Sequence, residues 1–478
     1  MFSQYKSKAM LDYFMEITKI PRPSYKEDKI ARYLCAFAAE RGLECSVDDK
    51  YNVHIKKAGS SGREDEGAVL LQGHTDMVCE CDAGIVWDCE REGVKTEVDG
   101  DFIHAQGTTL GGDDGAAVAA MLAILDGAAG SHPPIECLFT TCEEVGLDGA
   151  KAFDMKKISA RRMINLDSES EGEAIISCAG GMRTDIIMKA ETCPFENAPL
   201  KITVSGLCGG HSGADIHLGR ANANKLLARV LSSLLADTAN NLVSVFGGSK
   251  DNAITRSAEA VISVKDAESA KETLKSIEKD IIGTLSDEDS AEFSLACEVC
   301  DAPEYMCTHT SGVSFVELLL QLPYGVIEWI SEASGEVESS ANIGIVKSEG
   351  GVLSIAVSSR SNDEGKLDAI EKTLGDIAAE FGCSFTHRNR YPGWKNAGES
   401  RVEALYTESY EELFGVRPLI HAIHAGLECG LFKAAIPDMD IISIGPSIID
   451  IHTPRERMSL SSCDKFWQVL CRMLADKI

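Results

Sequence analysis

Residues 135–146 read Ile135-Glu136-Cys137-Leu138-Phe139-Thr140-Thr141-Cys142-Glu143-Glu144-Val145-Gly146, an apolar run that ends in two adjacent carboxylates. Bounded by Pro134 and Gly146, this run predicts a buried strand. Ligands of open α/β sheets bind outside the carboxyl ends of the strands, so Glu143 and Glu144 are expected to point into a site. Adjacent carboxylates repel each other unless one stays protonated or a cation lies beside them. The alternative is a strand that runs out into a solvated acidic loop.

Several other apolar runs also end in residue types that bind metals. In chain order these are His74 and Asp76 after residues 68–73, Asp167 after residues 163–166, and His452 after residues 441–446. Between the first two, a glycine-rich turn carries Asp113 and Asp114 and opens a predicted helix over residues 116–126. Together the predicted strand ends could supply a full set of metal ligands.

Length and composition restrict the class of protein. A chain of 478 residues is too long for one ordinary core, which predicts two domains. The 46 basic and 75 acidic residues give a formal net charge of −29, which argues against nucleic acid or an anionic membrane as a partner. The sequence contains no apolar stretch of about 18 residues, so no membrane span is predicted. The 17 cysteines form no disulfide framework and no secretory signal is recognised, so we expect a cytoplasmic protein with reduced thiols.

The order of predicted elements divides the chain into three segments. Helix and strand alternate as far as Asp167, as in a mostly parallel α/β sheet, and the second helix is expected to start with a capping box at Ser24 and Glu27. Longer alternating strands separated by amphipathic helices follow, and the α/β pattern returns near residues 391–394. We therefore predict a catalytic domain of residues 1–181 and 392–478, interrupted by an inserted α+β lid and dimerisation domain at residues 182–391.

The sequence His74-Thr75-Asp76 predicts one specific arrangement. Strand side chains alternate with period two, so the side chains of His74 and Asp76 point the same way. Asp76 could then orient the imidazole of His74 while its other nitrogen binds a metal ion.

Taken together, the motifs resemble those of the co-catalytic metallopeptidases of the M20 clan, and among them the aminoacyl-histidine dipeptidases, also called peptidase D or Xaa-His dipeptidases. The resemblance runs nearly from end to end. The motifs that carry it are residues 20–24 (IPRPS), 73–78 (GHTDMV), 109–115 (TLGGDDG), 143–147 (EEVGL), 165–169 (NLDSE), 209–217 (GGHSGADIH), 424–430 (HAGLECG) and 452–454 (HTP).

The resemblance implies two divalent metal ions bridged by Asp113. His74 and Asp167 would complete the site of one ion, and Glu144 and His452 that of the other. Glu143 would be the general base that activates a shared water, and Asp76 the orienting carboxylate. Zinc is the expected metal, although two histidines and three carboxylates also suit manganese or cobalt.

The resemblance also assigns residues in the inserted domain. His211 would stabilise the transition state in the active site of the partner subunit of a homodimer. Asn252 and Arg360 would hold the substrate carboxylate, and Gly426 would line the pocket through its backbone. Position 255 is threonine where the family pattern leads us to expect proline, which weakens the assignment of Asn252.

These implications predict a dipeptidase that hydrolyses small peptides of the Xaa-His type, including those like β-Ala-His. One alternative is another hydrolase of the clan, such as a tripeptidase or an N-acyl amino acid amidohydrolase. Another is a homologue without catalytic activity that serves as a binding protein. Such a homologue would have lost a ligand or the base, whereas here the five ligands, Glu143 and Asp76 are all present.

Overall fold

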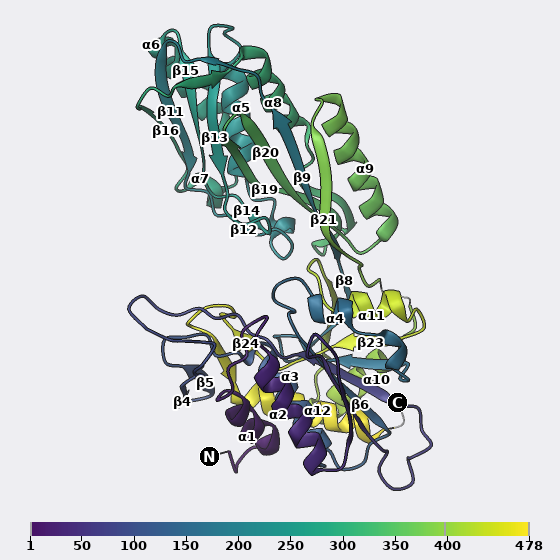
Figure 1. Ribbon diagram of the computed structural model, residues 1–478. Helices are drawn as coiled ribbons and strands as arrows, with labels where there is room; N and C mark the ends of the chain where they lie inside the picture. The colour runs from purple at the N-terminus through teal and green to yellow at the C-terminus, as the bar shows by residue number, and fades with distance from the viewer. Residues whose placement is uncertain (1, 396–397, 477–478) are drawn as a thin grey trace. The chain divides into compact units, whose positions relative to one another are not determined.

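The computed structural model describes residues 2–395 and 398–476 and divides into two compact units (Figure 1). Unit 1 comprises Met1–Cys178, Trp394–Ala422 and Leu427–Ile478, and unit 2 comprises Ala179–Gly393 and Ile423–Gly426. From the sequence, the inserted domain was predicted to span residues 182–391. The sequence did not predict that the short segment Ile423–Gly426 groups with unit 2.

Unit 1 is built on an eight-stranded sheet. In spatial order its strands are β1 (Glu44–Val47), β2 (Val53–Lys57), β6 (Ile135–Thr140), β3 (Val69–His74), β7 (Arg162–Asn165), β23 (Asp440–Ser443), β8 (Glu173–Cys178) and β22 (Leu419–Ile423). The four central strands, β6, β3, β7 and β23, run parallel. They confirm the predicted α/β class with a mostly parallel sheet, and their carboxyl ends all lie at the same edge of the sheet.

The helices of unit 1 are α1 (Lys8–Ile17), α2 (Asp28–Glu40), α3 (Gly112–Leu125), α4 (Asp148–Ala152), α10 (Arg401–Phe414), α11 (Cys429–Ala435) and α12 (Leu460–Ala475), with a 3₁₀ turn at Met155–Lys157. A smaller sheet has the order β24 (Ile448–Ile449), β25 (Arg457–Ser459), β5 (Phe102–Ala105) and β4 (Thr96–Asp99). Within the described chain, no helix is both long enough and apolar enough to cross a membrane.

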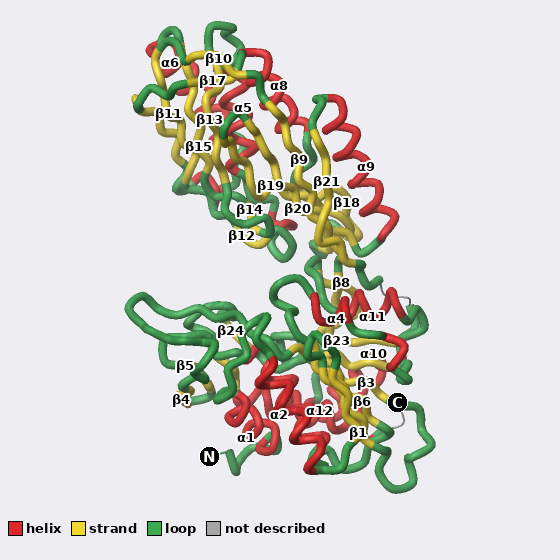
Figure 2. The backbone as a smooth tube through the Cα atoms, viewed as in Figure 1, coloured by secondary structure: helices red, strands yellow, loops and turns green. Residues whose placement is uncertain are grey.

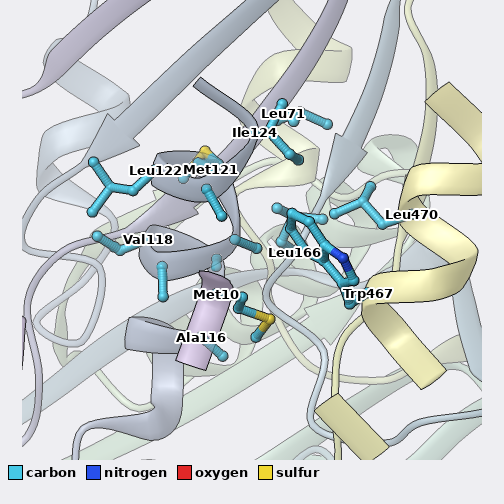
Figure 3. Packing of buried hydrophobic residues seen from close by; sticks show 14 of the residues in the cluster. Met10, Leu71, Ala116, Val118, Met121, Leu122, Ile124, Leu166, Trp467 and Leu470 are labelled. Carbon is cyan, nitrogen blue, oxygen red and sulfur yellow. The ribbon is translucent and has the colours of Figure 1, made fainter. Parts of the chain in front are cut away.

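Helix α3 is the centre of the core of unit 1. All of its residues are buried, and many are alanines, whose small side chains allow close packing on every side. Figure 3 shows Met10 of α1, Leu71 of β3 and Trp467 of α12 around it. A helix enclosed in this way gives Asp113, in its first turn, a rigid support.

Unit 2 is built on a nine-stranded sheet, whose strands are yellow in Figure 2. The strands of this sheet pair antiparallel. Its order is β16 (Ser294–Val299), β11 (Ala198–Ser205), β15 (Ala258–Val264), β13 (Asn241–Gly247), β19 (Glu336–Glu349), β20 (Val352–Ser361), β9 (Gly180–Lys189) and β21 (Ser384–Tyr391), with β18 (Gly325–Ser331) also paired to β19. The further elements of the unit are β10 (Thr192–Pro194), β12 (Gly210–His211), β14 (Ala253–Ile254), β17 (Tyr305–Cys307), a 3₁₀ turn at Ile216–Leu218, α5 (Ala223–Leu234), α6 (Ala267–Ile282), α7 (Asp287–Ser290), α8 (His309–Gln321) and α9 (Glu364–Glu380).

The core of unit 2 follows the period-two pattern of the sequence. Leu200, Ile202 and Val204 of β11 are buried, while the residues between them are partly exposed. The buried side chains join those of α5, α6, α8 and α9 in one hydrophobic cluster.

The predicted capping box at the start of α2 is wrong. Glu27 occupies the N-cap position and its side chain makes no capping hydrogen bond. The Ser24 hydroxyl donates instead to Asp76 Oδ2 at 2.8 Å, and Glu27 Oε1 accepts from the Cys142 amide at 2.9 Å. Both side chains thus bind residues at the carboxyl edge of the sheet. These contacts, with residues distant in sequence, take the place of the predicted hydrogen bonds between Ser24 and Glu27 and the start of α2.

Candidate metal centre

The predicted ligands come from separate elements of unit 1. His74 is the last residue of β3, Glu144 follows β6, and Asp167 follows β7. Asp113 lies in the first turn of α3, where its ψ of 110° departs from helical geometry. His452 follows β24 of the smaller sheet.

Asp113 lies between the two histidines. Its Oδ1 is 3.0 Å from His74 Nε2 and its Oδ2 is 3.1 Å from His452 Nε2. On one side Asp167 Oδ1 lies 3.5 Å from His74 Nε2, and on the other Glu144 Oε1 lies 2.9 Å from His452 Nε2. The five side chains therefore form two sets of donor atoms that share one carboxylate.

Asp114 also lies beside this cluster, although the sequence did not suggest it as a ligand. A carboxylate oxygen of Asp114 lies within 4.8 Å of donor atoms of His74 and Asp167. Its Oδ2 accepts from the His74 amide at 3.1 Å, and its Oδ1 accepts from the Ala117 amide at 3.3 Å. Because both oxygens accept from backbone amides, Asp114 supports the backbone of His74 and the start of α3.

Asp76 contacts both His74 and the pair of adjacent glutamates. His74 Nδ1, on the side of the ring opposite the Asp113 contact, lies 3.1 Å from the backbone oxygen of Asp76 and 3.4 Å from its Oδ1. Asp76 Oδ1 also accepts from the Glu143 amide at 3.0 Å, and Oδ2 accepts from the Glu144 amide at 3.3 Å. Burial opposes ionisation of Asp76, but the hydrogen bond with His74 holds its pKa below the usual value. Asp76 thus contacts the imidazole through its backbone oxygen and its carboxylate, and the carboxylate also holds the turn that carries both glutamates.

The site accumulates buried negative charge. Burial raises the pKa of Asp167 to about 6 and raises that of Glu143 well above its usual value, and nearby carboxylates add to both shifts. Hydrogen bonds with Asp113 and Glu144 raise the pKa of His452 to about 11. Carboxylates held together at this density favour a neighbouring cation. Imidazole nitrogen and carboxylate oxygen are the donors used by zinc and related divalent ions, so the residues fit such ions.

Two residues of the site have left-handed backbone conformations. Cys142, directly before Glu143, has φ of +50°, and the ligand candidate His452 has φ of +59°. Such conformations in residues other than glycine cost about 1–3 kcal/mol and cluster at functional sites. Here one lies directly before the proposed base and the other is a proposed ligand.

Unit 2 brings its predicted site residues close together. His211 in β12 pairs with Ala253 in β14, and the Ser212 amide donates to Asn252 O at 2.8 Å. The amides of Gly213 and Ala214 donate to His211 Nδ1 at 3.3 and 3.0 Å. Since Nδ1 is an acceptor, the proton of the neutral ring is on Nε2, which makes Nε2 a hydrogen-bond donor.

Arg360 and Gly426 lie in the same part of unit 2. A Cβ atom added to Gly213 would lie 3.1 Å from Arg360 Nε, 3.1 Å from His211 Cε1 and 2.3 Å from His424 O. Arg360 is buried; its Nη1 donates to Tyr391 OH at 3.0 Å, and its Nε has no partner among the described residues. A Cβ at Gly426 would lie 2.6 Å from the Tyr391 ring. The guanidinium therefore has an unused donor next to His211 and a glycine backbone.

Thr255 has a structural role in this unit. It is buried, and its hydroxyl lies 3.2 Å from Ile343 O and 3.0 Å from Gly344 O. A proline at this position could not make these bonds. The contacts explain the departure from the expected sequence, and they leave the role of the nearby Asn252 side chain a prediction.

Sequence reasoning missed Glu428 in unit 1. This residue is fully buried, and its Oε2 accepts from Thr140 Oγ1 at 2.7 Å and from Gln72 Nε2 at 2.5 Å. Burial raises the pKa of Glu428 to about 8. Its sequence signal was its place in the motif at residues 424–430, in which Gly426 was the predicted pocket residue.

Comparisons with known proteins identify the family of this chain. Residues 70–476 match the model of peptidase family M20/M25/M40. The chain is 35% identical over 477 residues to the cytosol non-specific dipeptidase of Escherichia coli, covering 99% of this chain and 98% of the relative.

Solved structures give the same result. The crystal structure of aminoacylhistidine dipeptidase from Vibrio alginolyticus matches with a TM-score of 0.88 and 32% identity, covering 99% of this chain and 97% of that one. A tripeptidase from Staphylococcus aureus shares the fold, with a TM-score of 0.56, 18% identity and 98% of each chain covered. These matches confirm the resemblance found in the motifs, and the chain belongs to peptidase family M20/M25/M40.

Proposed function

We propose that the protein is a cytoplasmic, metal-dependent dipeptidase with two divalent ions, expected to be zinc, in each subunit. Peptidases of this family are metal-dependent, and unit 1 contains candidate metal-binding residues. The observation that carries the proposal is the position of Asp113, whose two oxygens each face the Nε2 atom of a different histidine. The dipeptidase names of the Escherichia coli and Vibrio alginolyticus relatives support the substrate class.

His74 and Asp167 would hold one ion, Glu144 and His452 the other, and Asp113 both. Two such ions, when bound, polarise the scissile carbonyl and make a water molecule more acidic. Asp76 contacts the His74 ring at Nδ1 and would keep it oriented so that Nε2 faces the ions.

Glu143 would perform the proton transfers. Its carboxylate accepts a proton from the attacking water as the oxygen adds to the peptide carbon, and later gives that proton to the leaving amine as the C–N bond breaks. The backbone amide of Glu143 donates to Asp76 Oδ1 at 3.0 Å, and this contact supports a base next to the proposed ligand Glu144.

Unit 2 would recognise the other end of the substrate. A free dipeptide carries a carboxylate close to its scissile bond, and Arg360 offers an unused Nε donor beside Gly213 and His211. His211 would donate a hydrogen bond from its Nε2–H group to the developing oxyanion in the partner subunit of a homodimer.

A panel of substrates tests the proposed function. We expect the zinc-reconstituted protein to hydrolyse dipeptides, with β-Ala-His among them, and to leave tripeptides and N-acetyl amino acids almost untouched. Release of amino acids measured by chromatography gives kcat/KM for each compound. Faster turnover of a tripeptide or of an N-acetyl amino acid than of every dipeptide would refute the dipeptidase proposal in favour of another hydrolase of the clan.

The position of His211 can be tested by mixing two inactive variants. His211→Ala should lose about 10²–10³-fold in kcat, the equivalent of roughly 2.7–4 kcal/mol for one oxyanion donor. When His211→Ala and Glu143→Ala subunits exchange at random, about half of the dimers are mixed, and each has one intact site of two. Activity should then recover to about a quarter of wild type.

His217→Ala is the matched control, because His217 lies in the neighbouring 3₁₀ turn and has no proposed role. The His217→Ala variant should be active without mixing with a second variant. If mixing restores nothing although native mass spectrometry shows subunit exchange, His211 acts within its own chain or has no catalytic role.

A further inference from the structure

Glu456 binds a row of four consecutive backbone amides. Its side chain is only 2% exposed, although glutamate is rarely buried. Oε2 accepts from Leu110 and Gly111 at 2.8 and 3.0 Å, and Oε1 accepts from Gly112 and Asp113 at 2.7 and 3.3 Å. The last of these amides is that of Asp113, whose carboxylate lies between His74 and His452.

Arg22 makes the complementary contacts with backbone carbonyls. It is 1% exposed, and its Nη1 donates to Thr75 O at 2.9 Å and to Asp76 O at 3.2 Å. Its Nη2 donates to Gly111 O at 2.5 Å. One guanidinium thus joins the segment after His74 to the turn before Asp113.

Gly111 is held from both sides, by Glu456 through its amide and by Arg22 through its carbonyl. Its φ of +71° lies in the left-handed region, where glycine is favoured. A Cβ atom at Gly111 would lie 2.6 Å from Arg22 Nη2, and one at Gly115 would lie 2.7 Å from the same atom. The glycines of this turn therefore make room for the guanidinium.

We propose that Arg22 and Glu456 are positioning residues of the metal centre, which fix the backbone of Asp113 relative to His74 and His452. Glu456 lies four residues after His452 in the same turn, where its amide donates to Thr453 O at 3.0 Å. Three ligand-bearing segments, far apart in sequence, are thereby joined through two buried side chains. The inference rests on the proposed dinuclear centre and assigns these residues a task within it.

The effect should appear in metal affinity. Glu456→Gln retains the shape of the side chain, but its amide nitrogen cannot accept from backbone N–H groups. Arg22→Lys retains a charge but loses the planar fork that contacts three carbonyls. We expect each variant to bind Zn²⁺ or Co²⁺ about 10–100-fold more weakly than wild type, as is typical when groups behind metal ligands are changed. The measurement is a titration of the full-length, metal-free protein with Zn²⁺ or Co²⁺ against a competing chelator.

Glu136→Gln is the matched control. Glu136 is also 2% exposed in unit 1, and its Oε1 accepts from the Ser159 and Ala160 amides at 2.9 and 3.1 Å. It lies near the amino-terminal end of β6, away from the carboxyl edge that carries the site. This variant should lower the melting temperature yet bind metal as tightly as wild type.

The outcomes separate the inference from the proposed function. Wild-type protein that binds no metal would refute the proposed function itself. Wild-type protein that binds two ions, with unchanged affinity in Glu456→Gln and Arg22→Lys, would refute the inference alone. An equal loss of affinity in Glu136→Gln would also refute it, because the effect would then be general destabilisation.

If Glu456→Gln does not fold, Glu456→Asp provides the same test with a carboxylate that is one methylene shorter. In its metal-free form, the amides of residues 110–113 should exchange hydrogen faster than in wild type, while the rest of unit 1 keeps its protection. Unchanged exchange at these four amides together with wild-type metal affinity would refute the inference.

Discussion

Removal of bound metal should abolish hydrolysis completely, and Zn²⁺, Co²⁺ or Mn²⁺ should restore it. In the proposed chemistry the ions polarise the peptide carbonyl, so the protein without them has no group for this task. The five proposed ligand side chains converge on the place that the ions would occupy. The measurement is dipeptide hydrolysis after treatment with EDTA and dialysis, then after addition of each metal.

Metal removal should also lower the stability of the folded protein. Ligands that bind only the folded state stabilise it by about 2.7 kcal/mol at a free concentration 100 times Kd, so the melting temperature should rise when metal is added back. Full activity in a chelated sample that elemental analysis shows to be free of metal would contradict the proposed role of the ions.

The segments that carry the proposed ligands could be placed from the sequence because their signal is local. Each apolar run predicted a strand, and the residues directly beyond residues 68–73 and 163–166 proved to lie at the same edge of one sheet. Parallel topology turns several separate motifs into one site without any knowledge of loop conformation. His452 also lies where the motif order predicted, beside Asp113 and Glu144.

The contacts behind the ligands could not be found in this way. Ser24 and Glu27 form a good local capping pattern, yet in the structure they bind Asp76 and the Cys142 amide. Arg22 and Glu456 contact backbone groups. Every residue type has a backbone carbonyl, so the sequence does not indicate which residues make such contacts. Only the glycines at 111 and 115 hinted that another group approaches this turn closely.

Glu143→Ala should lose about 10²–10⁴-fold in kcat while keeping its full complement of metal. Removing a general base typically costs this much, and the proposed mechanism gives Glu143 no ligand role. The geometry supports the division of roles between the adjacent glutamates. Glu144 Oε1 lies 2.9 Å from His452 Nε2, within the proposed ligand set, while Glu143 is held beside it through its backbone amide.

Glu144→Ala is the matched variant, because it removes the same side chain one residue further along the same turn. It should lose metal from the site that includes His452, and its activity should recover in part when the metal concentration is raised. Glu143→Ala should not respond to added metal, because its defect is in proton transfer.

Glu143→Gln distinguishes the loss of the base from the loss of a side chain that fills space. The amide is almost isosteric with the carboxylate but cannot take a proton from water, so kcat should fall nearly as far as in Glu143→Ala while KM changes little. Metal content by elemental analysis and kcat at saturating dipeptide complete the comparison. If Glu143→Ala loses metal and Glu144→Ala keeps it, the roles of the two glutamates are exchanged, and Glu144 is the group that must move the proton.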